Sequence, residues 1–254
     1  MYTRYQGRTT ARICVLLNVH GGGFTFESGS LTESIPMANL IHTRVVSVLY
    51  RLTPEHPYPA QLDDAVAVYR ELLKTYRPEH IVIYGTSAGA ILTREIAVGL
   101  RQLGLPEPAA LEIFSGTGDL SMSGDTQALF TLNGLSGVPA MPDSKPILDK
   151  YLAGHDPKDP SVSPIYADLH GFPPTLFISS ERNALLSGTI NLHRAFLRAG
   201  VDARLIVFDG LAHTLWNEVE LPESCEAYGY MAAFLCRILQ WHDSGTKPPN
   251  GHWN

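Results

Sequence analysis

Residues 81–89, IVIYGTSAG, are the most informative part of the sequence about its fold. The first four of these residues are apolar and typical of a buried strand, and the next five, Gly85-Thr86-Ser87-Ala88-Gly89, match the pattern G-x-S-x-G. A helical pattern starts directly behind the serine. A strand, a sharp turn and a helix are the context in which this motif lifts a nucleophilic serine above a sheet. We therefore predict that Ser87 is a nucleophile, with a purely structural tight turn as the alternative.

On both sides of this stretch, apolar β-branched runs alternate with segments of helical period, which indicates a parallel sheet covered by helices. Strands are expected at 12–19, 44–50, 80–84, 111–114, 175–179 and 204–208, and helices at 31–41, 59–76, 88–103, 188–199 and 222–240. The segment 115–174 is expected to form a long excursion over one end of the sheet, with one helix near 146–152. The predicted fold class is α/β, a mostly parallel twisted sheet with helices on both faces. We expect a single domain over 1–254, with poorly ordered tails at 1–11 and 244–254.

The composition excludes several classes of protein. The 254 residues are 44% hydrophobic and 17% charged, which is typical of a folded globular chain rather than a disordered one. The net charge of -6 provides no basic surface for nucleic acid. The three cysteines are odd in number and widely spaced, which argues against a disulfide framework and against a zinc site. With no apolar run long enough for a membrane span and no visible secretory signal, a cytoplasmic location is expected.

A second glycine-rich motif, HGGGF at residues 20–24, ends the first expected strand. Consecutive glycines expose backbone N–H groups without side chains in the way, as an oxyanion hole requires. We predict that Gly21 and Gly22 form this hole with the N–H of Ala88, and that Gly23 and Phe24 shape the substrate site. A flexible turn is the alternative. Phosphate binding is disfavoured, because neither G-x-G-x-x-G nor a following Lys-Ser/Thr is present.

A hydrolytic serine also needs a base, which lies late in the chain when the order is serine, acid, histidine. Of the ten histidines, His213 is the best placed, since it ends DGLAH at 209–213, a turn that follows the expected strand 204–208. We predict that His213 is the general base. Leu211 and Trp216 beside it are expected to border the pocket together with the 115–174 excursion.

With the segment YRLTPEHPYPA at 50–60, these motifs resemble the bacterial hormone-sensitive-lipase-like family of α/β-hydrolases. The most similar branch is that of the carboxylesterases that include monoterpene ε-lactone hydrolases. The resemblance runs from about residue 12 to residue 239. It implies the α/β-hydrolase fold and a serine carboxylesterase that cleaves short- to medium-chain esters or lactones through an acyl-enzyme. It also implies that no metal or organic cofactor takes part, and a homodimer is a common assembly in the family.

Two features depart from the family pattern. The position of the triad acid holds Asn183, and an amide there can accept a hydrogen bond from histidine but does not stabilise an imidazolium and can favour the wrong tautomer. In serine proteases the same replacement lowers kcat about 10⁴-fold. Three explanations stay open: an engineered Asp-to-Asn substitution, Glu181 acting as a surrogate acid, or a degenerate homologue that binds a small ligand without turnover. In addition, only nineteen residues precede His20, so the N-terminal cap is expected to be largely missing and the site to be open.

Overall fold

The structure is a computed structural model that describes residues 14–121, 124–126, 145–218 and 220–239. Six strands form one sheet in the order β2-β1-β3-β4-β5-β6, and every neighbouring pair is parallel. The strands are β1 (Val15–Val19), β2 (Arg44–Val48), β3 (Ile81–Thr86), β4 (Ala110–Phe114), β5 (Thr175–Arg182) and β6 (Ala203–Ala212). The predicted parallel α/β sheet is therefore confirmed. The tails expected at 1–11 and 244–254 lie outside the described residues.

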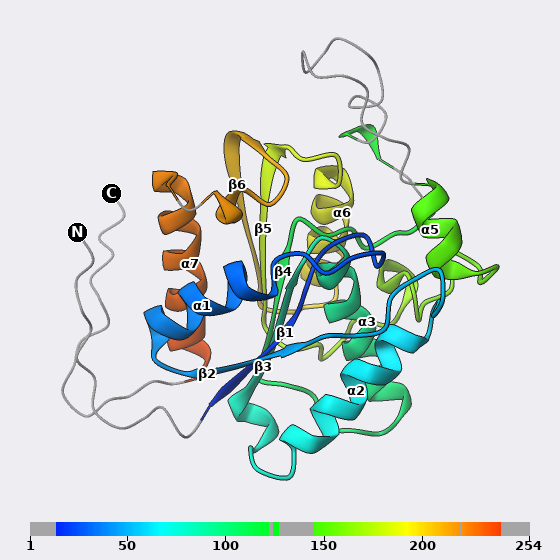
Figure 1. The fold of residues 1–254 in the computed structure, drawn as a ribbon, viewed down its shortest axis with the longest axis horizontal. Coiled ribbons are helices and arrows are strands. Elements are labelled where there is room, and N and C mark those ends of the chain that lie inside the picture. The colour runs from blue at the N-terminus through cyan, green and yellow to red at the C-terminus, as the bar shows by residue number, and fades with distance from the viewer. Residues whose placement is uncertain (1–13, 122–123, 127–144, 219, 240–254) are drawn as a thin grey trace.

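Helices cover both faces of the sheet (Figure 1). They are α1 (Ser30–Ile41), α2 (Ala60–Leu72), α3 (Ala88–Gln102), α5 (Lys145–Leu152), α6 (Leu186–Arg198) and α7 (Pro222–Ile238), with short 3₁₀ turns at Pro78–His80, Pro164–Tyr166 and Leu215–Asn217. Successive strand residues point to opposite faces, so each strand contributes to two apolar cores. Leu17 and Ile83 pack in the core beneath α2, α3 and α6, while Leu16 and Tyr84 pack in the core beneath α1 and α7.

Two strands extend further than the sequence pattern predicts. The expected strand 175–179 continues to Arg182, and the expected strand 204–208 continues to Ala212. The two extensions pair with each other, Arg182 opposite Ala212, after a register shift that begins at Ser180. This pairing between distant segments, rather than local apolar periodicity, lengthens both strands, and Leu211 consequently lies on β6 rather than in a turn.

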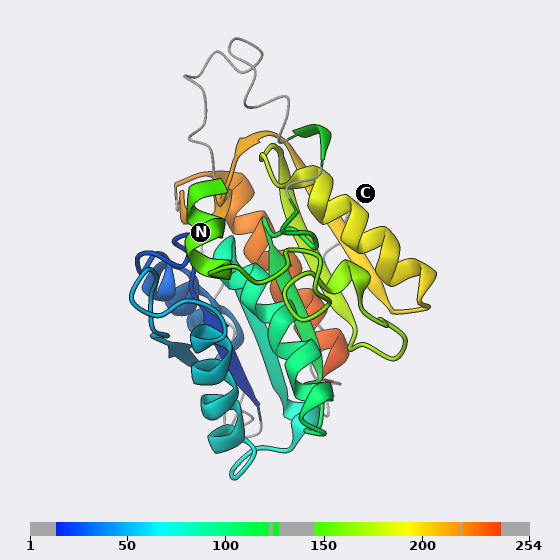
Figure 2. The ribbon, with the colours of Figure 1, turned by 90° about the vertical axis from the view of Figure 1, so that its right-hand side faces the viewer.

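The parallel topology gathers the candidate residues at one edge of the sheet. His20 follows β1, Ser87 follows β3, Asn183 follows β5 and His213 follows β6, each at the carboxyl end of its strand. The helix α5 lies at this same end, close to the start of α3 (Figure 2). In open parallel sheets this edge is where ligands bind.

Candidate active site

Ser87 occupies a strained turn between β3 and α3. Its backbone angles are φ 57° and ψ -115°, a region that non-glycine residues rarely adopt, and its N–H donates to the Phe114 carbonyl at 2.9 Å. Gly85 and Gly89 allow the turn to pack on β1, because a Cβ at these positions would lie 2.5 Å and 1.8 Å from the Val19 carbonyl oxygen. Within residues 81–90, Ser87 is the one residue that is not buried. The turn therefore presents the serine to solvent.

The glycine loop after β1 lies against this turn. A Cβ on Gly21 would be 3.1 Å from the Thr86 carbonyl oxygen and 3.5 Å from the Ser87 Cβ. The Gly21 N–H, however, already donates to the Ser28 carbonyl at 2.9 Å and is not free to donate to an oxyanion in this structure, so the role predicted for Gly21 stays a prediction. Within the described residues, the N–H groups of Gly22 and Gly23 donate to no backbone carbonyl.

The third predicted donor, Ala88, is the first residue of α3, and the N–H groups of the first helical turn have no intrahelical partner. The geometry therefore leaves Gly22, Gly23 and Ala88 available beside Ser87. Only glycine fits at position 22, because its φ is 108° and a Cβ would lie 1.9 Å from the Phe26 carbonyl oxygen. The sequence motif located the loop correctly, but it did not reveal which of its amides is already engaged.

The ends of β5 and β6 bring Asn183 and His213 together. The Nδ1 atom of His213 lies 2.9 Å from Asn183 Oδ1. The hydroxyl of Ser180 donates to the Ala212 carbonyl at 2.7 Å, which ties the backbone just before the histidine to β5. In this state of the protein, no direct hydrogen bond between Ser87 and His213 is formed among the described residues. Such catalytic hydrogen bonds often close only when substrate binds.

The Asn183 side chain is completely buried, with 0% of its surface exposed. Its Nδ2 donates to Ser179 Oγ at 2.8 Å, and its Oδ1 accepts the Leu185 N–H at 3.0 Å. Together with the contact to His213, these bonds engage both ends of the amide. The side chain is therefore held in place by three partners.

Burial controls the charge of the histidine. It lowers the pKa of His213 to about 4, and the side chain that faces its Nδ1 is the uncharged Asn183 amide. The imidazole is consequently neutral near pH 7 and able to accept a proton. Glu181, the candidate surrogate acid, is exposed and engages Asp209, and this carboxyl–carboxyl hydrogen bond raises the pKa of Glu181. The structure thus places Asn183, and not Glu181, against His213.

Phe24 and Trp216, two of the residues expected to border the pocket, are buried in the protein interior. Phe24 is 1% exposed and stacks on Tyr151 of α5 with ring centroids 3.7 Å apart. Trp216 is also 1% exposed, and its indole N–H donates to Thr86 Oγ1 at 3.2 Å. We correct their predicted role: in this structure they pack behind the serine turn and α5 and do not line an open pocket. Leu211 is partly buried and packs against the core on the α7 side of the sheet.

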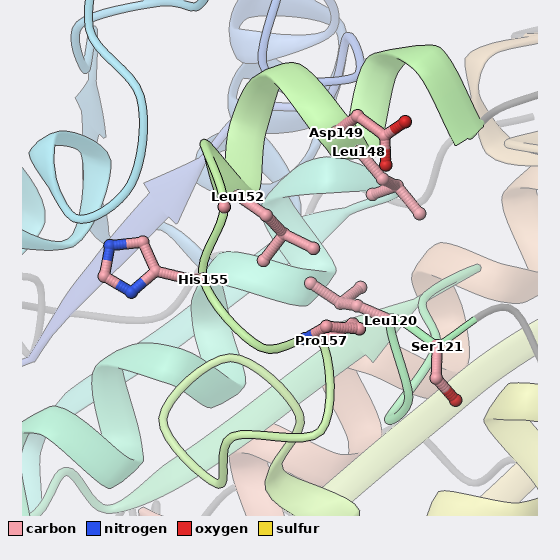
Figure 3. A pocket seen from close by; sticks show the side chains of 8 residues that line it. Leu120, Ser121, Leu148, Asp149, Leu152, His155 and Pro157 are labelled. Carbon is pink, nitrogen blue, oxygen red and sulfur yellow. The ribbon is translucent and has the colours of Figure 1, made fainter.

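The helix α5 contributes residues that the sequence motifs did not indicate. A Cβ at Gly23 would lie 3.3 Å from Ile147 Cγ2, so this face of α5 covers the glycine loop. On its other side, α5 borders an apolar cavity of about 350 Å³, in which Leu148 and Leu152 are directed towards Leu120 and Pro157 (Figure 3). That volume suits a small apolar group. The lining residues include neither Ser87 nor His213, so the cavity is a neighbouring space rather than the reaction centre.

Metal sites, disulfide bonds and membrane helices are absent from the part of the chain that the structure describes. Within the described ranges, no three His, Cys, Asp or Glu side chains gather closely enough to hold a metal ion. Cys14, Cys225 and Cys236 are all described, and none forms a disulfide bond. None of the helices in the described part of the chain has the length and apolar character needed to cross a membrane.

Comparison with known proteins agrees with this arrangement. A family model described as an alpha/beta hydrolase fold matches residues 16–217. An acetyl-hydrolase of Streptomyces hygroscopicus is 33% identical over 236 residues, which cover 91% of this chain and 76% of that protein. An esterase of Acinetobacter venetianus is 28% identical over 240 residues, covering 88% of this chain and 75% of that protein.

Solved structures of similar proteins point to the same family. The crystal structure of an esterase from the bacterial hormone-sensitive lipase family superposes with a TM-score of 0.83 at 34% identity, covering 91% of this chain and 79% of that one. The crystal structure of EstE5 soaked with p-nitrophenyl butyrate also gives a TM-score of 0.83, at 30% identity, with 93% of this chain and 80% of that one covered. The chain therefore belongs to the hormone-sensitive-lipase-like family of α/β-hydrolases.

Proposed function

We propose that this chain, an esterase-type α/β-hydrolase, cleaves short- to medium-chain carboxylic esters, lactones among them, through an acyl-enzyme on Ser87. One observation carries the proposal: the partly exposed Ser87 stands on a strained turn at the same sheet edge as the neutral His213. Next to it lie backbone N–H groups that donate to no backbone carbonyl among the described residues. A nucleophile, a base and an oxyanion hole are the parts that acyl transfer needs.

The proposed reaction proceeds in two halves. His213 Nε2 takes the Ser87 hydroxyl proton while Oγ attacks the ester carbonyl, and the N–H groups of Gly22, Gly23 and Ala88 stabilise the oxyanion. The tetrahedral intermediate collapses, and His213 gives the proton to the departing alcohol. Water then attacks the acyl-enzyme with His213 again as base, which releases the carboxylic acid and restores Ser87.

The relatives and the cavity support the substrate class. The matched proteins bear the names acetyl-hydrolase and esterase, and one structural neighbour was soaked with a butyrate ester, so short acyl groups are the first choice. The apolar cavity beside α5 favours substrates that carry an apolar group attached to the ester or lactone that reacts at Ser87. Because Asn183 carries no charge to stabilise the imidazolium, we expect turnover to be slow.

Covalent labelling tests the role of Ser87. A fluorophosphonate probe, applied for long periods at mildly alkaline pH to offset slow activation, should modify Ser87 and no other serine. Ser87→Ala should abolish labelling, while Ser161→Ala, an equal change in a loop far along the chain, should not. Labelling at another serine, or undiminished labelling of Ser87→Ala, would falsify the assignment.

The second candidate function is ligand binding without turnover, and Asn183 in place of a carboxylate is the observation that favours it. The discriminating measurement is hydrolysis of p-nitrophenyl esters by the wild type and by Asn183→Asp. If neither protein turns over any ester and Ser87 resists labelling, the binding function is favoured. A thermal-shift search for ligands then becomes the appropriate assay, since a bound ligand stabilises the folded state.

A further inference from the structure

We infer that Ser179 and the Leu185 N–H orient the Asn183 amide so that His213 carries its proton on Nδ1 and keeps Nε2 free. In this form the histidine can act as a base without a triad carboxylate. Ser179 is then a positioning residue. The inference rests on the proposed function for the task of His213, but the protonation of its ring can be measured without any activity.

The orientation of the amide follows from its partners. The backbone N–H of Leu185 is only a donor, so the Asn183 atom 3.0 Å away from it must be the oxygen. A flipped amide would set its NH₂ group against that N–H, two donors facing each other in a fully buried place. On the opposite side, Nδ2 donates to Ser179 Oγ at 2.8 Å, and a hydroxyl can accept this bond.

The orientation of the amide determines the protonation of the histidine. The same Oδ1 lies 2.9 Å from His213 Nδ1, and a carbonyl oxygen can only accept. Nδ1 must therefore be the nitrogen that carries the proton, and a neutral imidazole has only one to place. In water the neutral side chain favours the opposite form, with the proton on Nε2, so the amide reverses the ordinary preference.

On this inference, the amide at position 183 does not favour the wrong tautomer. An asparagine selects the wrong histidine tautomer only when the NH₂ end of its amide faces the histidine, and not when its oxygen does. Here two consecutive residues of β5 serve the two partners: Ser179 holds the Asn183 amide, and Ser180 holds the Ala212 carbonyl just before His213. Only the first of these contacts bears on the orientation of the amide.

Nuclear magnetic resonance reads the ring nitrogens directly. Histidine-labelled protein with ¹⁵N is recorded at pH 7 by two-bond ¹H–¹⁵N correlation, and the His213 signals are identified by their loss in His213→Gln. We expect the Nδ1–H form with an unprotonated Nε2. Finding the Nε2–H form, or a ring protonated at both nitrogens, would overturn the inference.

Ser179→Ala then tests the positioning role, with Ser180→Ala as the matched control. We expect a fraction of the Nε2–H form to appear in Ser179→Ala and not in Ser180→Ala. If the wild type is active, Ser179→Ala should lower kcat about 10-fold, the worth of one buried hydrogen bond, with little change in KM. In an Asn183→Asp background the same substitution should leave the His213 tautomer unchanged, since both oxygens of a carboxylate accept and no orientation needs to be selected.

The outcomes separate the inference from the proposed function. A tautomer that Ser179→Ala leaves unchanged in the Asn183 protein would reduce Ser179 to a structural residue and overturn its positioning role. An inactive protein that nevertheless holds His213 in the Nδ1–H form would support the inference and contradict the proposed function. An active protein that holds His213 in the Nε2–H form would support the proposed function and contradict the inference.

Discussion

Replacing Asn183 by aspartate adds the one element that this catalytic arrangement lacks. The two side chains have the same shape, the Leu185 N–H can donate to a carboxylate oxygen, and the Ser179 hydroxyl can turn to donate as well. The change therefore places a negative charge 2.9 Å from His213 Nδ1 with little steric disturbance. Its effect should fall on the imidazolium that forms in the transition state.

The magnitude follows from the geometry. Two unit charges about 4 Å apart interact by about 4 kcal/mol at an effective dielectric constant of about 20, and the cost of burying the carboxylate removes part of this. A net gain of ~3 kcal/mol corresponds to a rise in kcat of about 10²-fold, with KM changed far less. This is smaller than the ~10⁴ of the protease template, because there the amide also imposed the wrong tautomer.

The pH profile provides a second check with a defined sign. The base must be neutral, so kcat/KM of the wild type should fall only as the pH drops through the low pKa of His213, about 4. A neighbouring carboxylate stabilises the protonated ring and raises that pKa, so Asn183→Asp should lose activity at a higher pH. The advantage of the variant in kcat/KM should accordingly shrink towards acidic pH. Chromatographic measurement of phenol released from phenyl acetate between about pH 3 and pH 9 covers the plateau and the acidic fall of both proteins.

Specific results would refute this reasoning. An unchanged kcat in Asn183→Asp, together with inactivity of Glu181→Gln, would make Glu181 the acid despite its exposed position. A gain of ~10⁴ or more would mean that the wild-type amide holds the wrong tautomer. Glu181→Gln is the matched control and should change kcat little, since Glu181 engages Asp209.

Three further predictions address the glycine loop, the core and the cavity. Gly22→Ala should reduce kcat/KM at least 10²-fold, because its Cβ would collide with the Phe26 carbonyl and displace an oxyanion donor; wild-type activity would contradict this. Glu112 is buried in β4, and neither of its carboxyl oxygens has a hydrogen-bond partner among the residues that the structure describes. Burial raises the pKa of Glu112 well above 4.5, so Glu112→Leu should raise the free energy of unfolding by about 1–3 kcal/mol near pH 7. Because the folded state favours the protonated form, wild-type stability should decline as pH rises above about 4.5, and the advantage of the variant in urea unfolding should grow with pH; a smaller advantage at pH 8 than at pH 5 would refute the assignment. Leu148→Trp should fill the cavity and lower kcat/KM for bulky esters or lactones while sparing acetates, with Leu148→Ala as control; equal losses on both substrate classes would separate the cavity from substrate binding.

The parallel sheet, the turn at Ser87 and the edge of the sheet that carries the candidate site could be predicted from the sequence. A run such as 81–84 is apolar on both faces because its strand is buried between two helical layers, so the pattern of apolar residues is enough to infer the parallel sheet. The turn at Ser87 could be inferred as well, since glycine is the only residue type that fits at positions 85 and 89 against the Val19 carbonyl. The sheet edge shared by Asn183 and His213 follows from the parallel order of β5 and β6.

Only the tertiary structure decided how individual polar groups are used. The Gly21 N–H is engaged because the chain folds back to place the Ser28 carbonyl against it, which no glycine pattern reveals. Trp216 can be buried because its indole N–H donates to the hydroxyl of Thr86, 130 residues away in the sequence. The Asn183 amide points its oxygen at His213 because the Leu185 N–H and Ser179 fix its two ends. A sequence specifies which donors and acceptors exist, but hydrogen bonds are directional and short, so their pairing depends on positions that exist only after the chain has folded.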